Sequence, residues 1–266
     1  MLATTVDGGD GVDKLVLATA GTAFVDADFA KISSIETVSL TGASTIVLGT
    51  NAGVTGVEKV ITGNAATSIS SASDITVDGT ALGSVALTLL GSGAIIATSG
   101  DTATKIDGSA ATGSLTLTGG LLTTTILGGT ASDKIVGGAI AETITSVAGD
   151  DTIDGGSGAD VITAGAGIDS VTGGADTDKF IIATADDDTA ASSAAITDII
   201  TDFATGSDML VIGATPAAGV AVTITPAVAQ VSTVTLSTFG IGDNITISGI
   251  GGTAAAVNAV TDISTT

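Results

Sequence analysis

The sequence predicts an all-β protein, a right-handed parallel β-solenoid that continues as a β-roll and ends in a C-terminal β cap. Three observations lead to this fold class. Residues 128–181 divide into six consecutive nine-residue repeats with no insertion or deletion. Upstream of them, short β-rich runs recur at intervals of about ten residues. The aromatic residues are five Phe, with no Trp or Tyr, so the core must consist of aliphatic side chains and Thr, which suit stacked strands.

The first 118 residues predict an irregular solenoid. Its β-rich runs are 37–40, 45–48, 57–62, 75–77, 85–89, 94–97 and 115–118. Gly, Asn, Ser or Asp separates them, and they lie too close together for crossover helices between parallel strands. One weakly periodic stretch, 26–35, is a candidate helix. Leu117 and Ile126 already fall on the register of the later repeats, so we expect the solenoid to run without a break into the roll.

The six repeats share an acid and a hydrophobic residue two positions apart. They read GGTASDKIV, GGAIAETIT, SVAGDDTID, GGSGADVIT, AGAGIDSVT and GGADTDKFI. The acids at position six are Asp133, Glu142, Asp151, Asp160, Asp169 and Asp178. The hydrophobic residues at position eight are Ile135, Ile144, Ile153, Ile162, Val171 and Phe180. A further copy, GGDGVDKLV, occupies residues 8–16, with Asp13 and Leu15 in the equivalent places.

This pattern predicts calcium sites between stacked turns. Glycines at positions one, two and four permit positive φ and a tight bend, which lets carbonyl groups point inward. Ca²⁺ prefers six to eight oxygen ligands, so one turn provides half a site and the turn stacked on it provides the rest. Two repeats form one coil, so the acids form two ladders: Asp133, Asp151, Asp169 and Glu142, Asp160, Asp178. The candidate metal-binding residues are these six acids with Asp13, Gly9, Gly11, Gly129, Gly149, Gly156, Gly158, Gly165, Gly167 and Gly174.

Several repeats depart from the consensus. Ala131, Ile140 and Asp176 occupy the fourth position, and Ser146 and Val147 replace both leading glycines. The sites around Asp151, Asp160 and Asp169 therefore fit the pattern best, and the site around Glu142 fits it least. The alternative interpretation, a flexible Gly/Ser/Asp linker, does not explain why a large apolar residue keeps its register through all six repeats.

Composition favours cations as partners. The chain has 28 acidic residues against six basic ones, a net charge of −22, which argues against nucleic acid or an anionic membrane surface. Like charges about 5 Å apart repel by roughly 3 kcal/mol at an effective dielectric of 20, so we expect the roll to be disordered without calcium. There is no Cys, hence no disulfide framework. The uncharged stretches 79–100 and 209–242 are interrupted by Gly or Pro, and strands are a better interpretation than membrane spans. No Sec signal is visible.

The repeats stop after Ile181, and we expect domain boundaries of 1–118, 119–181 and 182–266. An acidic tract at 186–188 leads into 196–214, where Phe203 could plug the open end of the solenoid. Asp202 and Asp208 either close a last calcium site or are solvated turn residues. Alternating apolar and hydroxyl residues at 220–225, 231–236 and 244–248 predict closing strands.

Together these residues resemble a known family. Tandem GGxGxDxUx repeats at 128–181, followed by a D-x-I-x-D-F-x-x-G-x-D-x-L-like segment at 198–210, resemble RTX proteins. The phrases FAKISSIETVSLTGAS and IDGSAATGSLTLTGG resemble the solenoid of RTX bacterial surface-layer proteins of the Caulobacter type. The resemblance implies Ca²⁺ binding, type I secretion with an uncleaved C-terminal signal, an extracellular location and self-assembly into a lattice. Any contact with cell-surface polysaccharide would use a region not evident in this sequence. A first repeat that begins so close to Met1 is compatible with the C-terminal piece of a longer protein.

The sequence therefore leaves three candidate functions. The first is a non-catalytic, calcium-hardened surface protein that assembles into a lattice or filament. The second is the RTX portion of a secreted enzyme, although a chain without His cannot itself carry HExxH or a Ser–His–Asp triad. The third is an adhesive or ice-binding solenoid, suggested by Thr-rich strands at 114–118, 123–125 and 233–235.

Overall fold

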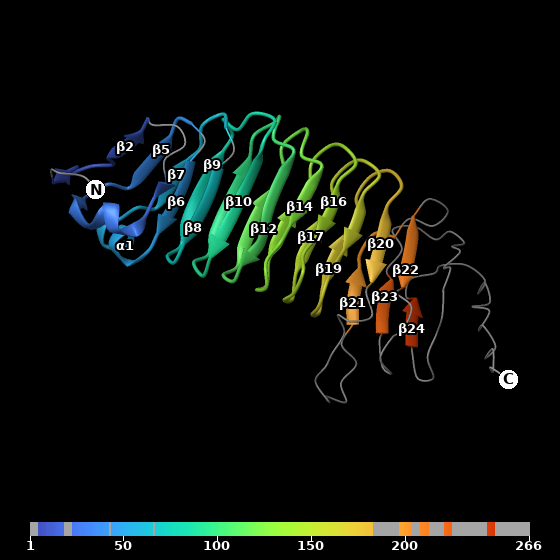
Figure 1. The fold of residues 1–266 in the computed structure, drawn as a ribbon. Helices are drawn as coiled ribbons and strands as arrows, with labels where there is room; N and C mark the ends of the chain where they lie inside the picture. Colours follow the sequence, from blue (N-terminus) through green and yellow to red (C-terminus); the bar gives the residue numbers. More distant parts are fainter. Residues whose placement is uncertain are drawn as a thin grey trace.

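The computed structural model describes residues 5–18, 23–42, 44–65, 67–182, 197–203, 208–212, 221–224 and 244–247. Over these residues the fold is a parallel β-solenoid, as predicted: the chain winds through coils whose strands stack into two long sheets (Figure 1). Every strand pair in this part of the chain is parallel, because each strand pairs with the equivalent strand of the next coil. Among the described residues, no helix is long and apolar enough to cross a membrane.

Two sheets make up almost all of the described structure. The first sheet has twelve strands: β2 (Lys14–Leu17), β5 (Thr37–Leu40), β7 (Lys59–Ile61), β9 (Ile75–Gly79), β11 (Ile95–Ser99), β13 (Leu115–Thr118), β15 (Lys134–Val136), β17 (Thr152–Asp154), β19 (Ser170–Thr172), β21 (Thr197–Ile200), β23 (Ala221–Ile224) and β24 (Asn244–Ile247). The second sheet has ten: β3 (Ala23–Phe24), β6 (Ser44–Leu48), β8 (Thr67–Ser71), β10 (Ala86–Gly91), β12 (Lys105–Ala111), β14 (Thr125–Leu127), β16 (Thr143–Thr145), β18 (Val161–Thr163), β20 (Lys179–Ile182) and β22 (Met209–Ile212). A small pair joins β1 (Val6–Asp7) to β4 (Ile32–Ser33).

The predicted register is confirmed. Leu117 pairs with Ile135, which pairs with Ile153, so the core residues of the first sheet lie two repeats apart in the sequence. Ile126 and Ile144 pair in the same way in the second sheet. All five side chains are buried at 1% exposure or less. The interior of the roll is thus a single column of apolar residues on each sheet, one per three-residue strand.

Upstream coils carry more core. Ile75 pairs with Ile95, which pairs with Leu115, and each of them begins a strand that buries a second inward residue two positions later. These longer strands therefore bury about twice as many aliphatic side chains per coil as the roll does. The helix predicted over 26–35 is shorter than expected, a 3₁₀ helix η1 (Asp26–Lys31), and an α-helix α1 (Thr50–Thr55) was not predicted.

These two helical segments are joined by one carboxylate. Asp26 accepts hydrogen bonds from the backbone N–H groups of Gly49, Asn51 and Ala52, at 2.8–3.1 Å. Asp26 therefore satisfies the free N–H groups at the start of α1, as a cap residue would. Beside them Phe29, 2% exposed, is buried in the apolar core.

The C-terminal strands continue the two sheets. β20 pairs with β22, and β19 is followed in its sheet by β21, β23 and β24. Phe203 is buried, with its ring centre 5.9 Å from that of Phe180, but strands extend the stack beyond it. It therefore fills the core inside the stack instead of plugging its end. The strand predicted at 231–236 and the acidic tract at 186–188 lie outside the described residues.

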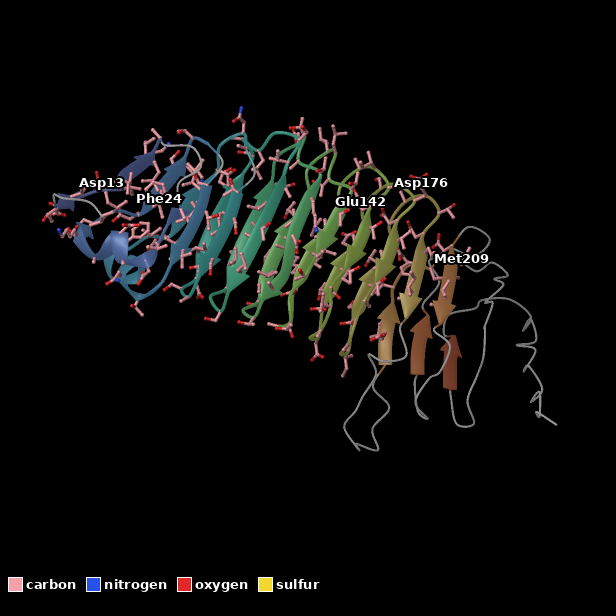
Figure 2. All side chains as sticks on the ribbon, viewed as in Figure 1. Asp13, Phe24, Glu142, Asp176 and Met209 are labelled. Carbon is pink, nitrogen blue, oxygen red and sulfur yellow. The ribbon has the colours of Figure 1, made fainter. Side chains whose placement is uncertain are left out.

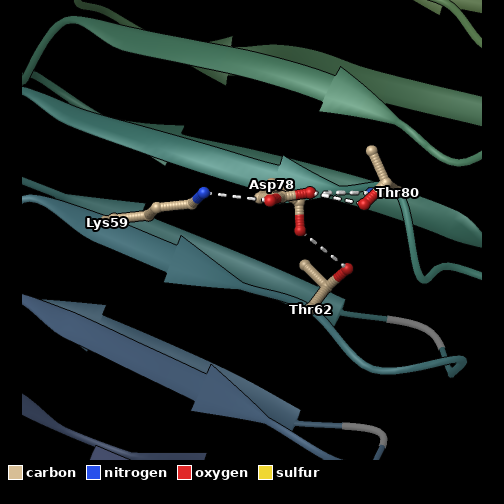
Figure 3. Close-up of polar contacts among 4 residues, drawn as sticks. All are labelled: Lys59, Thr62, Asp78 and Thr80. Carbon is tan, nitrogen blue, oxygen red and sulfur yellow. Dashed lines mark hydrogen bonds and ion pairs between the residues drawn. The ribbon is translucent and has the colours of Figure 1, made fainter. Parts of the chain in front are cut away.

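Two lysines pair with acids on the outer faces. Lys59 Nζ lies 3.0 Å from an Asp78 carboxylate oxygen, and the other oxygen accepts a 2.6 Å hydrogen bond from the Thr80 hydroxyl (Figure 3). The Thr62 hydroxyl donates to the carbonyl oxygen of Asp78 from the preceding coil. Lys105 pairs with Asp107 in the same manner, at 2.8 Å. Such exposed ion pairs contribute about 0–1 kcal/mol each, so the core and the turns decide whether the coils stack.

Candidate metal centres in the turn stacks

The turns of the roll form two stacks on opposite sides of the rod. The first turn stack consists of 128–133, 146–151 and 164–169, each leading into a strand of the twelve-stranded sheet. The second turn stack consists of 137–142, 155–160 and 173–178, leading into the ten-stranded sheet. Backbone hydrogen bonds join neighbouring turns, for example Ala166 N–H to the Val147 carbonyl at 3.0 Å and Ala175 N–H to the Gly156 carbonyl at 2.8 Å.

The acids at position six lie inside these stacks, not in solvent. All six are 1–4% exposed. One oxygen of each later acid is fixed by the preceding coil: the Asp133 N–H donates to Asp151 Oδ1 at 2.7 Å, and the Asp151 N–H donates to Asp169 Oδ1 at 2.8 Å. In the second turn stack the same bonds join Glu142 to Asp160 (2.7 Å) and Asp160 to Asp178 (2.9 Å). The structure thus brings together the two ladders that the repeat spacing predicts.

Four of these carboxylates keep one buried oxygen with no hydrogen bond of ordinary geometry, although Ser146 lies close to Asp151 and Glu142 lies close to Asp160. The four are Asp151, Asp160, Asp169 and Asp178, and in each the atom is Oδ2. Leaving a buried acceptor unsatisfied costs about 1–3 kcal/mol, and more for a charged group. Four equivalent atoms in successive turns are thus each open to a further partner, which a water molecule or a cation would provide.

Asp133 differs from the other aspartates of the ladders. Its Oδ1 accepts from the Leu115 N–H at 2.7 Å and its Oδ2 accepts from the Gly129 N–H at 2.6 Å, so protein donors satisfy both oxygens. Glu142 is buried with no hydrogen bond of ordinary geometry to either oxygen. Its longer side chain instead reaches toward the turn, close to Gly138.

Left-handed backbone occurs in the four turns whose aspartates keep an unpartnered Oδ2, but not in the turn of Glu142, whose oxygens also have no partner. Positions two and four have positive φ in 146–151, 155–160, 164–169 and 173–178; the residues are Val147, Gly149, Gly156, Gly158, Gly165, Gly167, Gly174 and Asp176. In the first two turns, 128–133 and 137–142, no residue has positive φ. Glycine adopts this conformation at little cost, whereas Val147 and Asp176 adopt it under strain.

Glycine occurs at position one for a different reason from the one expected. It does not adopt positive φ in these turns. Instead, a Cβ atom on Gly155 or Gly173 would lie 2.5 Å from Oδ2 of Asp160 or Asp178, respectively. The missing side chain therefore makes room for the carboxylate, and the unpartnered oxygen points into the turn.

Burial raises the pKa of these carboxyl groups. It raises the pKa of Asp151 and Asp160 to about 7, that of Asp169 to about 8 and that of Asp178 to about 6. Backbone N–H groups lower each value in part, and neighbouring acids in the ladder raise it further. Without a cation the ladders are therefore partly protonated near neutral pH.

This arrangement fits a hard divalent cation. Each of the four turns offers a buried anionic oxygen, and carboxylate and carbonyl oxygens are the ligands that Ca²⁺ takes. In the part of the chain that the structure describes, no three side chains of Asp, Glu, His or Cys converge on one point. A cation here would therefore draw on one carboxylate from each of two stacked turns and on backbone carbonyl groups.

The isolated N-terminal repeat has the same geometry. Gly9 and Gly11 have φ of 88° and 122°, and Asp13 Oδ2 is buried without a partner. The Asp13 N–H donates to Glu36 Oε2 at 2.7 Å, just as Asp133 donates to Asp151. Figure 2 places Asp13 near the N-terminal end of the rod, and Glu142 far along it in the roll. Sequence analysis missed Glu36, although Glu36 and Val38 show the same acid-and-hydrophobe spacing.

Beyond the repeats, three aspartates continue the stacks. Asp198 Oδ1 accepts from the Asp169 N–H and Asp208 Oδ1 accepts from the Asp178 N–H, both at 3.0 Å, so each adds a rung to one ladder. Asp198 was not among the predicted ligands. Asp202 lies differently: its two oxygens accept from the N–H groups of Gly173 (2.9 Å) and Gly174 (2.7 Å). Its carboxylate thus covers the last regular turn of the second turn stack.

Comparison of the chain with protein-family profiles, with curated proteins and with solved structures finds no match.

Proposed function

We propose that this protein is a calcium-dependent structural protein of the extracellular cell surface, whose copies associate into a lattice or filament. It would belong with the RTX proteins, be exported by a type I system and have no catalytic role. One observation carries the proposal: the four turns with left-handed backbone at positions two and four are the same four whose buried aspartates keep an unpartnered oxygen. A flexible linker or a metal-independent solenoid does not require left-handed backbone and an unpartnered aspartate oxygen in the same turn.

The chain's own residues would hold the ion as follows. Within a turn stack, Oδ1 of Asp169 is fixed by the Asp151 N–H, which leaves Oδ2 available to a cation. The glycines at positions two and four bend the backbone so tightly that carbonyl groups of the turn can join it. Bound Ca²⁺ would supply the positive charge that the ladders lack.

A structural role is supported by the shape and surface of the rod. Both sheets are long, and side chains stand along the whole rod (Figure 2). The outward rows carry hydroxyl, charged and aliphatic side chains, such as Thr116, Lys134 and Ile96. Long parallel sheets with repeating surfaces favour side-by-side or end-to-end association of copies. The sequence contains no His, and its buried carboxylates lie in turn interiors where bulky substrates have no access.

The ice-binding alternative finds less support on the described faces. In the outward row of the twelve-stranded sheet, Thr116 and Thr152 are separated by Lys134, and Ile96 precedes Thr116. A flat hydroxyl ladder is therefore interrupted within a few coils. The Thr-rich segment at 233–235 lies outside the described residues.

Circular dichroism during a calcium titration, followed by electron microscopy of the calcium-loaded sample, tests the proposal. We expect the β signal to rise with Ca²⁺, ordered arrays or fibres to form, and a chelator to dissolve them. Mg²⁺ at equal ionic strength is the control, because it binds carboxylate ladders poorly where near-octahedral geometry is lacking. A β signal that does not change with calcium, or arrays that persist in chelator, would rule out the calcium-dependent role.

A further inference from the structure

The solenoid changes the chemistry of its turns close to Asp133. In the coil upstream, the hydroxyl groups of Ser99 and Thr123 lie 2.9 Å apart, and the Gly120 N–H donates to both. Thr123 in turn donates to the Ala103 carbonyl at 3.1 Å. A hydroxyl group both donates and accepts, so this turn is satisfied by protein groups alone. The acid of the later turns can only accept.

Unpartnered buried oxygens follow the same division. In the described residues from 44 to 127, the Ser44 hydroxyl is the one buried side-chain oxygen that has no hydrogen-bond partner. Between residues 142 and 178, five acids carry such oxygens. The coils between residues 44 and 127 therefore need no added ligand to satisfy their interior, whereas the roll and the isolated turn at Asp13 do.

The apolar core divides at the same place. Most upstream strands bury two aliphatic residues each, such as Leu87 and Leu89 or Leu115 and Leu117, whereas a roll strand buries one, such as Ile153. Between β5 and β13 the exceptions are β7 and β8, which bury one each, Val60 and Ile69. Each such side chain stabilises the fold by about 1.5–3 kcal/mol when buried, so a roll coil has about half the apolar stabilisation of the coil formed by β9 and β10. In stacked repeats, weak units depend on the interface with a folded neighbour.

Asp133 is the junction between the two parts. Its side chain is fixed from upstream by Leu115 and by its own turn at Gly129. Its backbone N–H then holds Asp151 Oδ1, and the Asp151 N–H holds Asp169 Oδ1. Each carboxylate is thus positioned by the coil before it, so order along the ladder is passed from the N-terminal side to the C-terminal side.

We propose that the solenoid from β6 to β14 folds without calcium and is the template on which calcium orders the roll, coil by coil from Asp133 onward. The proposal rests on the calcium dependence stated above and adds to it an order of events and a boundary. The calcium-free protein is then a folded half-rod with a disordered continuation, not an unfolded chain.

Hydrogen exchange followed by mass spectrometry on the full chain tests this. In EGTA we expect the amides of β9, β11 and β13 to be protected at least a hundredfold more than those of β17 and β19. Added calcium should protect β17 and β19 and change the upstream strands little. Equal exchange of both regions in EGTA, whether both protected or both unprotected, would overturn the template.

Two matched core variants separate the template from calcium binding itself. Ile106→Asp, in an upstream strand, should remove calcium-induced protection from β17 and β19 as well as its own region. Ile153→Asp, in the roll, should leave β9, β11 and β13 protected in EGTA. If calcium still protects β17 and β19 in Ile106→Asp, the template is wrong while the calcium role stands. If calcium protects nothing in the unmodified protein, the calcium role fails, and the templated assembly with it.

Discussion

The backbone N–H of Asp151 donates to Oδ1 of Asp169 across one coil at 2.8 Å, while Oδ2 of Asp169 is buried without a partner. The two oxygens of this carboxylate therefore have different roles. One oxygen is part of the hydrogen-bonding ladder that fixes the spacing of the turns, and the other is available to a ligand. A neutral Asn could replace the first role but not the charge of the second, which makes the two roles separable by experiment.

Asp169→Asn should weaken calcium binding at least tenfold, because it removes an anionic ligand while keeping an Oδ1 acceptor for the Asp151 N–H. Asp133→Asn is the matched control in the same ladder. Both oxygens of Asp133 already accept backbone N–H groups, so neither is available to calcium. The variant loses one of these hydrogen bonds, because an amide nitrogen cannot accept, but no ligand, so it should change calcium affinity less. Isothermal titration calorimetry measures both. An equal loss of affinity in the two variants would contradict the assignment of the unpartnered oxygens as ligands.

Stability without metal should fall as pH rises. Burial raises the pKa of Asp169 to about 8, from 3.8, so between these values the folded roll binds a proton that the unfolded chain releases. The unfolding free energy of any ordered metal-free roll therefore decreases from about pH 4 to pH 8. Calcium competes with this proton, so calcium affinity should rise over pH 6–8. The β signal in circular dichroism, followed in EGTA from pH 8 down to pH 4, should therefore rise as the roll becomes ordered, and calorimetry over pH 6–8 measures the trend in calcium affinity.

The proton competition has its own control. Calcium binding at pH 7 should release protons, seen as a binding enthalpy that varies with the ionisation enthalpy of the buffer. Asp169→Asn removes one titrating group and should reduce this release. A release that is unchanged in the variant would show that other groups supply the protons.

The period of the repeats made the fold predictable from sequence. Two nine-residue repeats equal one coil, so the spacing from Leu117 to Ile135 to Ile153 fixes both the stacking and the face that is buried. Upstream, coil length varies: Lys14 pairs with Thr37, and this coil is longer than the one that pairs Lys59 with Thr76. From Ile75 to Ile95 to Leu115 the spacing is regular, but it differs from that of the earlier coils and of the roll, so the sequence predicts strands but not their pairing.

The candidate site was predictable only where glycine marked the turn. Glu36 occupies a ladder position, but no glycine turn precedes it: β4 and Ser34, whose φ is 55°, stand where the repeats have their glycines. Asp198 was hidden because residues 183–196 separate it from the last repeat. Asp133 has the same place in its repeat as the later acids, but its hydrogen bonds differ from theirs. Its partners are the N–H groups of Leu115 and Gly129, because the first repeat stacks on an upstream coil that has no acid in its turn.

Gly156→Ala should destabilise the calcium-loaded roll by about 2 kcal/mol or more. Gly156 has φ of 100°, and an added Cβ would lie too close to the Gly138 carbonyl oxygen in the preceding turn. Gly119→Ala is the control, because its Cβ would meet no atom closer than 3.3 Å and its φ is not positive. We expect it to cost less than about 1 kcal/mol. Thermal unfolding with saturating calcium compares them, and equal costs would contradict the role of close turn contact.

Val147→Gly should stabilise the roll, although it removes a hydrophobic side chain. Val147 is the position-two residue of its turn and has φ of 82°, a conformation that costs a β-branched residue about 1–2 kcal/mol. The larger backbone entropy of glycine in the unfolded chain offsets part of this, so we expect a net gain of about 1 kcal/mol. Ile140→Gly is the matched control. Ile140 also stands where the consensus has glycine, but its φ is not positive, so glycine there relieves no strain and should destabilise the fold. Chemical denaturation in saturating calcium should therefore move the two midpoints in opposite directions, and a loss of stability in Val147→Gly would show that its turn does not adopt the left-handed conformation.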